Sequence, residues 1–328
     1  MTARDRIIAS SRGGASERRR GSVRDTGDPE AITWSNIRRA WRAYLLLAPI
    51  FALLIVFVYY PPILGFVRAF FKWAPTKEPV FVGLRNFRSY FAFPEASREF
   101  INVIKLACFG LVSSVLAPLV MAEMIFAVRS NAGKEIYRYI VVIPMLVPGV
   151  VYTLLWQHIY DPNLGPINAL LRAVGLGALQ NDWLGNPNTA LYAIMGVGFP
   201  WVAQIGTLIC LGGLAQVPDS VFDACLLDGC TGVRRIVTVD LPLILSQIRL
   251  LTILSVINAF TSFNSVLILT RGGPGYATSV PALRMFERAF TTGEYGYAAA
   301  IGLLLFTLAV GLTVLINRYM RPHFERDS

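Results

Sequence analysis

Six long stretches of the chain contain no Asp, Glu, Lys or Arg, and this feature limits the fold more than any other. A helix needs about 20 apolar residues to cross the hydrocarbon core of a bilayer. Charged residues make up only 15% of the 328 residues, against roughly 25% in a soluble domain. We therefore expect six transmembrane helices and not a soluble apolar core. The six stretches are 43–67, 106–122, 139–160, 183–218, 250–270 and 295–317. The second is shorter than a span and must extend to about 101–127 to cross the bilayer.

The distribution of Lys and Arg predicts how the chain is oriented in the membrane. Alternate segments at 1–42, 128–138, 215–245 and 318–328 carry 18 of these residues, and the loops between them carry nine. Cytoplasmic flanks keep the excess of positive charge. Both termini are therefore expected in the cytoplasm. The formal net charge of +10 reflects this bias, and nucleic acid is not expected as a partner because the arginines do not lie on one folded face.

The composition excludes several classes of function. No G-x-x-x-x-G-K-[ST] motif is present, so the chain is not expected to hydrolyse nucleotide. Its two histidines, His158 and His323, cannot build a metal site together, and no nucleophile and base are paired as in an enzyme. Glu123, Lys105 and Arg249 are the only ionisable residues within predicted spans, and each is expected to snorkel to a membrane edge. The polar segment 1–42 is predicted to be a disordered tail rather than a signal peptide.

A compact charged segment, DACLLDGCTGVRRIVTVDLP at 223–242, interrupts the apolar stretches. Ser220 and Asp223 have the spacing of a capping box that begins a helix. One apolar face is predicted from Val221, Phe222, Cys225 and Leu226, and Gly229 suits a left-handed helix end. A second short helix is expected from about 231, with Pro242 in the first turn of the next span. The segment therefore predicts two short helices at the cytoplasmic surface that fit a groove on another protein.

This segment resembles the EAA loop of permease subunits in binding-protein-dependent ABC importers. The resemblance lies in Asp223-Ala224-Cys225, Asp228-Gly229-Cys230 and Leu241-Pro242, with Asp223, Cys225 and Cys230 replacing Glu, Ala and Ala of the family pattern. It implies a type I (MetI-like) permease fold whose loop 215–242 inserts into a cleft of an ATP-binding subunit. The residues implied in this coupling are Val221, Phe222, Asp223, Ala224, Cys225, Asp228, Gly229, Leu241 and Pro242.

Further motifs resemble the carbohydrate branch of this family, and in particular the larger maltose permease and the first glycerol-phosphate permease. They are YP at 60–61, VGLRNF at 82–87, DP-x-x-G-x-IN at 161–168, LT-x-GGP at 269–274 and YGYAAA at 295–300. The resemblance implies a second, homologous permease subunit, two ATP-binding cassette subunits and an extracytoplasmic solute-binding protein. ATP and Mg²⁺ would be bound by the partner ATPase subunits, with no cofactor on this chain, in the cytoplasmic (inner) membrane of a bacterium or archaeon.

A polar stripe in the fifth apolar stretch is the candidate solute pathway. Ser255, Asn258, Thr261, Ser262 and Ser265 fall within about 120° on a helical wheel. Such groups face protein or a watery cavity, because unpartnered amides and hydroxyls are costly in lipid. Packing between helices through small polar residues remains the alternative. The resemblance adds Phe263 and Asn264, and the kinked fourth stretch offers Trp201 and Gln204 beside Pro200.

The organisation expected from these observations is a single permease core behind a separate first helix. Its parts are a tail at 1–42, a first transmembrane helix at 43–71, an external loop at 72–98, a core at 99–320 and a cytoplasmic tail at 321–328. The predicted function is import of an oligosaccharide or related polyol, driven by ATP hydrolysis on partner chains. An autonomous secondary transporter or facilitator, and an ABC permease for a non-sugar solute, are the alternatives.

Overall fold

The computed structural model describes residues 41–200 and 204–320, and it divides between Tyr59 and Tyr60 into two compact units. The predicted tails, apart from residues 41 and 42, lie outside the described residues. In the first unit, α2 (Trp41–Leu53) continues into a π-helical segment (Leu54–Tyr59). Its side chains are almost all exposed, as expected of a helix whose surroundings are lipid or another chain.

Three helices are long and apolar enough to cross a membrane, and three further helix pairs meet the same criterion if each bent pair is counted as one span. The described chain is therefore mostly helical, with three to six candidate spans, in agreement with the prediction of a polytopic helical protein. The three long helices are Tyr44–Arg68, Ala96–Phe126 (α5, Ala96–Leu111; a π-helical segment, Val112–Leu116; α6, Ala117–Phe126) and Tyr295–Tyr319 (α18).

The third apolar stretch is broken at its prolines. The helix Asn131–Leu146, made of α7 (Asn131–Val142) and a 3-10 turn, meets α8 (Gly149–Ile159) at 86°. Pro148 lies between them as the N-cap of α8, and proline disfavours helical backbone in the residue before it. The fourth stretch is also interrupted, with α10 (Ala190–Gly196) and α11 (Gln204–Leu214) as its two described helices.

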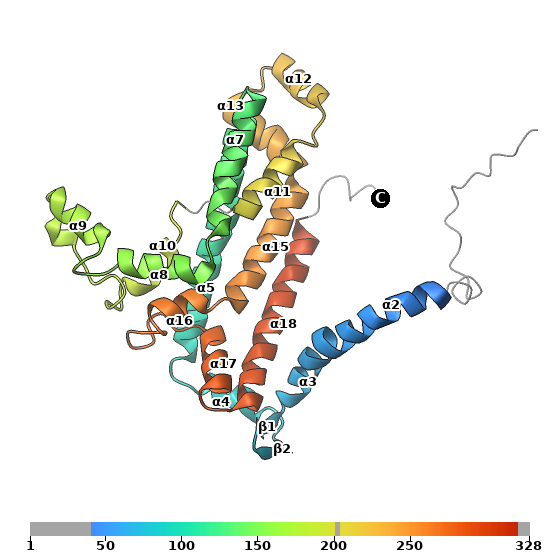
Figure 1. Ribbon diagram of the computed structural model, residues 1–328, viewed down its shortest axis with the longest axis vertical. Coiled ribbons are helices and arrows are strands. Elements are labelled where there is room, and N and C mark those ends of the chain that lie inside the picture. Colours follow the sequence, from blue (N-terminus) through green and yellow to red (C-terminus); the bar gives the residue numbers. More distant parts are fainter. Residues whose placement is uncertain (1–40, 201–203, 321–328) are drawn as a thin grey trace, which may run out of the picture. The chain divides into compact units, whose positions relative to one another are not determined.

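In the second unit, the two ends of the bundle carry different elements (Figure 1). α15 and α18 run along the bundle, with α12 and α13 at one end and α4, β1, β2 and α17 at the other. The coupling segment thus lies at the opposite end from the 72–98 loop. The remaining helices are α3 (Tyr60–Arg68), α4 (Arg85–Phe91), α9 (Pro166–Ala173), α12 (Asp219–Leu227), α13 (Gly232–Arg235), α14 (Leu241–Leu243), α15 (Leu245–Thr261), α16 (Asn264–Leu269) and α17 (Pro281–Phe290).

A small β-hairpin lies within the helical fold, and it was not among the predicted elements. β1 (Phe71–Ala74) and β2 (Lys77–Phe81) pair antiparallel, with Phe71 opposite Phe81. The rings of these two residues are in edge-on contact at 5.3 Å. Buried Asn86 donates from Nδ2 to the carbonyls of Ala69 and Phe71 at 2.8 and 2.9 Å, which ties the hairpin to α4. The fold is therefore helical with one short ribbon.

Two apolar clusters hold the second unit together. The larger joins α4, α5, α15, α17 and α18 around Tyr90, Phe260, Leu283 and Ile301. The smaller joins α6, α7, α11 and α15 around Ala122, Cys210 and Leu214. Gly206 and Gly213 allow α11 to approach its neighbours closely, since a Cβ at either would meet Pro118 or Gln247 at 2.9 and 2.8 Å. Leu241 of the coupling segment packs against the smaller cluster, so this cluster places α6 near that segment.

Candidate functional site

The first coupling helix, α12, begins two residues earlier than predicted and without a capping box. Its N-cap is Pro218, and no side chain accepts a hydrogen bond there. Proline fixes φ near −65° and is suited to enter a helix, so Pro218 sets the start in place of Ser220. Asp219 then lies in the first turn, where a negative charge is favourable to the helix dipole. The predicted Ser220–Asp223 capping box is therefore wrong, although the helix itself is present.

The end of α12 follows the prediction. Gly229 has φ of +66°, in the left-handed region. The amide of Cys230 donates to the carbonyl of Cys225 at 2.8 Å, and the amide of Gly229 donates to that of Leu226 at 3.1 Å. These two bonds form a Schellman motif, which satisfies the last carbonyls of the helix and turns the chain sharply. Gly229 is therefore a conformational requirement of the loop.

The apolar side chains of α12 point in two directions. Val221 and Phe222 are half-buried and Cys225 is buried against the chain itself. Leu226 is exposed instead, so the predicted single apolar face is wrong. Leu227 and Val233, which were not among the predicted residues, are 88% and 75% exposed. The outward face thus carries Leu226, Leu227, Val233, Asp223, Ala224, Asp228 and Gly229.

The second coupling helix is longer than expected. Helical backbone runs from Gly232 to Leu243 through α13, a π-helical segment (Ile236–Asp240) and α14, and then meets α15 at 75°. Pro242 lies near the end of this helix and is exposed, and Leu241 is half-buried. The next span begins at Leu245, after buried Ile244. The prediction that Pro242 lies in the first turn of that span is therefore wrong. Pro242 lies next to the bend that precedes the span.

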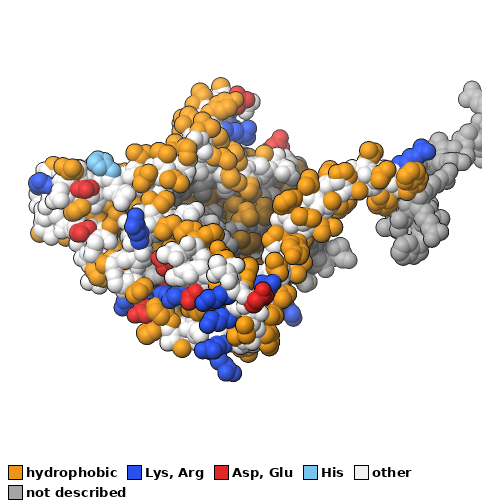
Figure 2. All heavy atoms as spheres, turned by 60° about the horizontal axis from the view of Figure 1, so that its bottom comes forward, with side chains coloured by type: hydrophobic (Ala, Val, Ile, Leu, Met, Phe, Trp, Pro, Cys, Tyr) orange, Lys and Arg blue, Asp and Glu red, His pale blue; other side chains and the backbone are white. Residues whose placement is uncertain are grey.

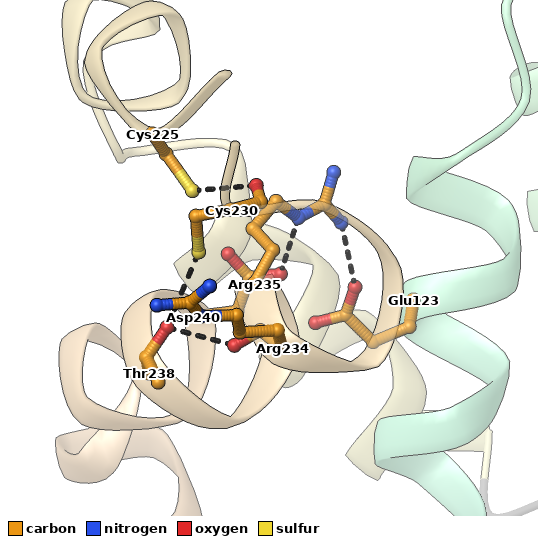
Figure 3. A network of polar contacts seen from close by, with 7 residues as sticks. All are labelled: Glu123, Cys225, Cys230, Arg234, Arg235, Thr238 and Asp240. Atoms are coloured by element: carbon orange, nitrogen blue, oxygen red, sulfur yellow. Dashed lines mark hydrogen bonds and ion pairs between the residues drawn. The ribbon is translucent and has the colours of Figure 1, made fainter. Parts of the chain in front are cut away.

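A buried ion cluster joins the coupling segment to a transmembrane helix (Figure 3). Arg235 donates from Nε to Asp240 Oδ2 at 2.9 Å and from Nη2 to Glu123 Oε2 at 3.2 Å. The Glu123 side chain is 8% exposed and that of Asp240 is fully buried. The prediction that Glu123 snorkels to a membrane edge is wrong, because the guanidinium of a residue 112 positions away in the sequence reaches it inside the protein. Residues this distant cannot be paired by local sequence patterns.

Aromatic contacts follow the same line. Phe222 of α12 and Phe126 of α6 have ring centroids 5.3 Å apart. The Arg235 guanidinium lies 5.6 Å from the Phe222 centroid and 5.8 Å from that of Phe126. A cation within about 6 Å of a ring is attracted to its face. α12 is therefore connected to α6 through two rings and one guanidinium.

Two thiols meet at the tip of the coupling loop. Cys225 donates from Sγ to the Cys230 carbonyl at 2.9 Å, and Cys230 Sγ lies 3.3 Å from Thr238 Oγ1. The Cys225 thiol and the Thr238 hydroxyl hold the pKa of the Cys230 thiol below its usual range, and Cys230 with local burial raises the pKa of Cys225 to about 11. The cysteines are free, and no cluster of His, Cys, Asp or Glu that could hold a metal exists within 41–200 and 204–320.

A small cavity gathers most of the predicted solute-pathway residues. Its volume is about 220 Å³, and its lining includes Ser255, Asn258, Ser262, Phe263 and Ser265. α15 ends at Thr261, and the backbone of Ser262 is extended. The prediction that the five polar residues lie on one continuous helix is therefore wrong. The helix break at Ser262 and Phe263 turns Ser265 toward the same cavity. Thr261 donates to the Ile257 carbonyl at 2.9 Å, and neither Thr261 nor Asn264 lines the cavity.

A second cavity of about 510 Å³ adjoins the first. Gln204 lines it together with Tyr152, and Ser113 and Ser114 line both cavities. The prediction missed these two serines, although a Ser-Ser pair within the apolar stretch 106–122 is a signal of the same kind as the stripe in the fifth stretch. Trp201 lies outside the described residues. No Lys, Arg, Asp or Glu is among the residues that line the two cavities.

The opposite end of the second unit is polar and basic. Figure 2 shows Lys and Arg side chains gathered on the face that carries the hairpin and α4. A broad pocket of about 1150 Å³ lies there, lined in part by Lys72, Lys77, Arg85 and Arg288. Arg288 donates to Glu294 at 2.9 Å. A basic pocket thus lies at this end of the unit, whereas no Lys, Arg, Asp or Glu lines the two cavities.

Comparison with known proteins identifies the family. Residues 114–325 match the family described as the binding-protein-dependent transport system inner membrane component. This match covers the coupling loop, most of the residues that line the two cavities, and the last span. The chain belongs to this family. It is therefore a transport subunit of a multi-pass inner-membrane type, with the helical permease fold, and a solute-binding protein is among its partners.

Two relatives of this permease subunit match along nearly their whole length, and a third matches over 71% of its length. The trehalose/maltose transport system permease protein MalF of Thermococcus litoralis is 30% identical, covering 88% of this chain and 96% of the relative. The probable ABC transporter permease protein YurN of Bacillus subtilis is 27% identical, covering 86% and 97%. The diacetylchitobiose uptake system permease protein NgcF of Streptomyces coelicolor is 30% identical, covering 73% and 71%.

A solved structure has the same fold. The bacterial alginate ABC transporter in complex with a pentasaccharide-bound periplasmic protein contains a chain that superposes with a TM-score of 0.77. That chain is 22% identical to this one, and the alignment covers 88% of this chain and 96% of the other. This chain therefore has the same overall fold as that chain.

Proposed function

We propose that this chain forms half of the translocation pathway of an ABC importer for a neutral oligosaccharide or a related polyol. A second, homologous permease chain supplies the other half, and two ATP-binding cassette subunits hold ATP and Mg²⁺. An extracytoplasmic solute-binding protein delivers the solute. This chain carries out no catalysis and holds no cofactor, and its termini and loop 215–242 face the cytoplasm.

The observation that carries the solute class is the absence of charge around the two cavities. The side chains of Asn258, Gln204 and Tyr152, with the neighbouring serines, can donate and accept hydrogen bonds. A buried ionised solute needs a countercharge, because its desolvation is otherwise costly. None of the residues that line these cavities is ionised at neutral pH. Neutral hydroxyl groups are the chemistry that such a lining accommodates.

The named relatives support this class. Trehalose, maltose and diacetylchitobiose appear in the names of two relatives, and all three sugars are neutral. The solved neighbour belongs to an importer of alginate, an acidic polysaccharide. An acidic solute would require basic groups in the cavities, so this chain is expected to differ from that neighbour in the charge of its solute.

Exposed apolar residues of α12 and α13 support coupling to a separate ATPase. Leu227 of α12 and Val233 of α13 lie on a surface at one end of the bundle, and burial of each would gain about 1.5–3 kcal/mol. An autonomous facilitator needs no such surface. An ABC permease for a non-sugar solute would use the same surface, so the solute must be tested separately.

Uptake into proteoliposomes tests the solute class. The chain is co-expressed with its second permease, ATPase and solute-binding protein, and ATP-dependent uptake of radiolabelled maltose, trehalose and diacetylchitobiose is compared with that of an alginate oligosaccharide. We expect uptake of a neutral sugar only. Uptake of the acidic oligosaccharide, or of no sugar by an assembled and ATP-hydrolysing complex, would contradict the proposed class. Uptake by this chain alone would establish the facilitator instead.

A pair of matched variants tests the cavity. Asn258→Asp places a carboxylate in the cavity, and Asn264→Asp makes the same change at an exposed position outside it. We expect the first variant to lower maximal sugar uptake by about tenfold or more, because the carboxylate lacks the two amide donors and puts a charge into an otherwise uncharged lining. The second variant should leave uptake near wild type. The reverse order would place the pathway elsewhere.

A further inference from the structure

α12 has few contacts through which its movement could reach the membrane. Its outward side chains, Leu226 and Leu227, are exposed and are not buried by any other part of the described chain. Its inward contacts include Phe222, which packs on Phe126 near the end of the transmembrane helix Ala96–Phe126. A force on α12 therefore has a short route to that helix.

Arg235 lies at the centre of this route. Its side chain contacts three elements: Asp240 within its own helix, Glu123 on α6, and the Phe222 ring on α12. The Glu123 and Asp240 side chains are buried, and that of Arg235 is 27% exposed. Solvent therefore weakens the bonds of Arg235 to the two carboxylates only in part. Figure 3 shows the guanidinium between the two carboxylates.

The cluster contains more acceptors than donors. Two carboxylates share one guanidinium, and Glu123 Oε1 and Asp240 Oδ1 are buried without a hydrogen-bond partner among the described residues. Buried carboxylate oxygens nearly always have partners. Withdrawal of Arg235 would leave both carboxylates without a countercharge, which is costly in a protein interior. The guanidinium is therefore held firmly between α6 and the coupling segment.

We propose that Arg235 and Glu123 are positioning residues that transmit movement of the coupling helix α12 to the transmembrane helix Ala96–Phe126. The same helix carries Ser113 and Ser114, which line both cavities. Closure of the ATPase subunits moves α12, the Arg235–Glu123 bond carries that movement to α6, and the cavity changes its access. This inference rests on the proposed coupling to an ATPase but not on the identity of the solute.

Two variants at one position isolate the hydrogen bond. Glu123→Gln and Glu123→Ala both remove the negative charge, but only glutamine keeps an oxygen that can accept from Arg235. In both variants Arg235 keeps its bond to Asp240. If the bond transmits movement, Gln retains the coupling and Ala loses it. A role limited to charge would affect the two variants equally.

The experiment follows access to the cavity in the assembled complex. Ser113→Cys is introduced in a chain whose four cysteines are replaced, and its labelling rate with a maleimide is measured with and without Mg-ATP and vanadate. We expect trapping to change the rate in the parent chain and in Glu123→Gln, and the change to be lost in Glu123→Ala. Basal ATP hydrolysis should persist in all three, because the outward face of α12 is unchanged.

Each outcome decides a separate point. Loss of the ATPase from the parent complex, or no effect of trapping there, contradicts the proposed function. A normal effect in Glu123→Ala, or an equal loss in both variants, overturns the inference alone. Should Glu123→Ala fail to assemble, Glu123→Leu also removes the acceptor for Arg235 but keeps apolar bulk at this position. A full trapping effect in Glu123→Leu would also overturn the inference.

Discussion

Arg284 donates from Nε to Glu99 Oε1 at 2.7 Å, at the end of the bundle opposite the coupling loop. Glu99 is fully buried and also accepts from Ser279 and Tyr90. The Arg284 guanidinium lies 3.6 Å from the centroid of the Phe93 ring. This pair therefore fixes α5 against α17 and the loop that follows α16. No local pattern predicts this pair, because the partners are 185 residues apart.

Loss of Arg284 should destabilise the chain strongly. Arg284→Met leaves the buried Glu99 carboxylate without a countercharge, and we expect a loss of about 3–5 kcal/mol. Arg288→Met removes an exposed bond to Glu294 and should cost at most about 1 kcal/mol. Thermal unfolding of the two variants in detergent gives the comparison. Equal melting temperatures would show that the buried pair contributes little.

The helix end at Gly229 should not accept a side chain. Gly229→Ala forces an L-residue into the left-handed region at φ +66°, at a cost of about 1–2 kcal/mol. Nothing lies within 4 Å of the added Cβ, so backbone strain is the only cause. Gly212→Ala also meets no neighbour, but it lies in regular helix and should stabilise α11 by up to about 1 kcal/mol. Amide hydrogen exchange should become faster in α12 of Gly229→Ala and slower in α11 of Gly212→Ala. A change in the same direction in both helices would contradict this explanation.

The thiols of the coupling loop should react at different pH. Because the pKa of Cys230 is lowered, its thiolate forms at a lower pH than an ordinary cysteine, while Cys225, with its pKa of about 11, stays protonated. Iodoacetamide should therefore alkylate Cys230 first as the pH rises, and mass spectrometry of the digested chain measures the order. Cys225→Ala removes the largest cause of the lowered pKa. The Cys230 profile should then move to higher pH, and an unmoved profile would refute the assignment.

The sequence predicted the features that depend on local composition. Apolar stretches predicted six spans, and the described residues contain three to six candidate spans, depending on how the bent pairs are counted. Gly229 predicted the end of α12 because no other residue adopts its φ as easily. The start of α12 was wrong because Pro218 competes with Ser220 for the same role. The bend after Leu243 and the break at Ser262 depend on packing against other helices, so no wheel drawn on a straight helix could show them.

The site was predicted only in part for the same reason. Asn258, Ser262 and Phe263 could be found because polar residues are conspicuous within an apolar stretch. The partners of Glu123 could not, since a single sequence does not show which distant Arg will approach it. Leu227 and Val233 were missed because an apolar residue in a charged loop does not show by itself whether it faces inward or outward.

The outward face of α12 should bind a separate ATPase subunit. Leu227→Asp is a sharp test of this contact, because the Leu227 side chain is 88% exposed and its replacement should not disturb the fold. Leu164→Asp is the matched control, at a 77% exposed position in the loop before α9. Co-purification of the ATPase subunit with the tagged chain is the measurement. We expect Leu227→Asp to lose the ATPase and Leu164→Asp to retain it fully, and an ATPase bound equally by both variants would rule out this contact.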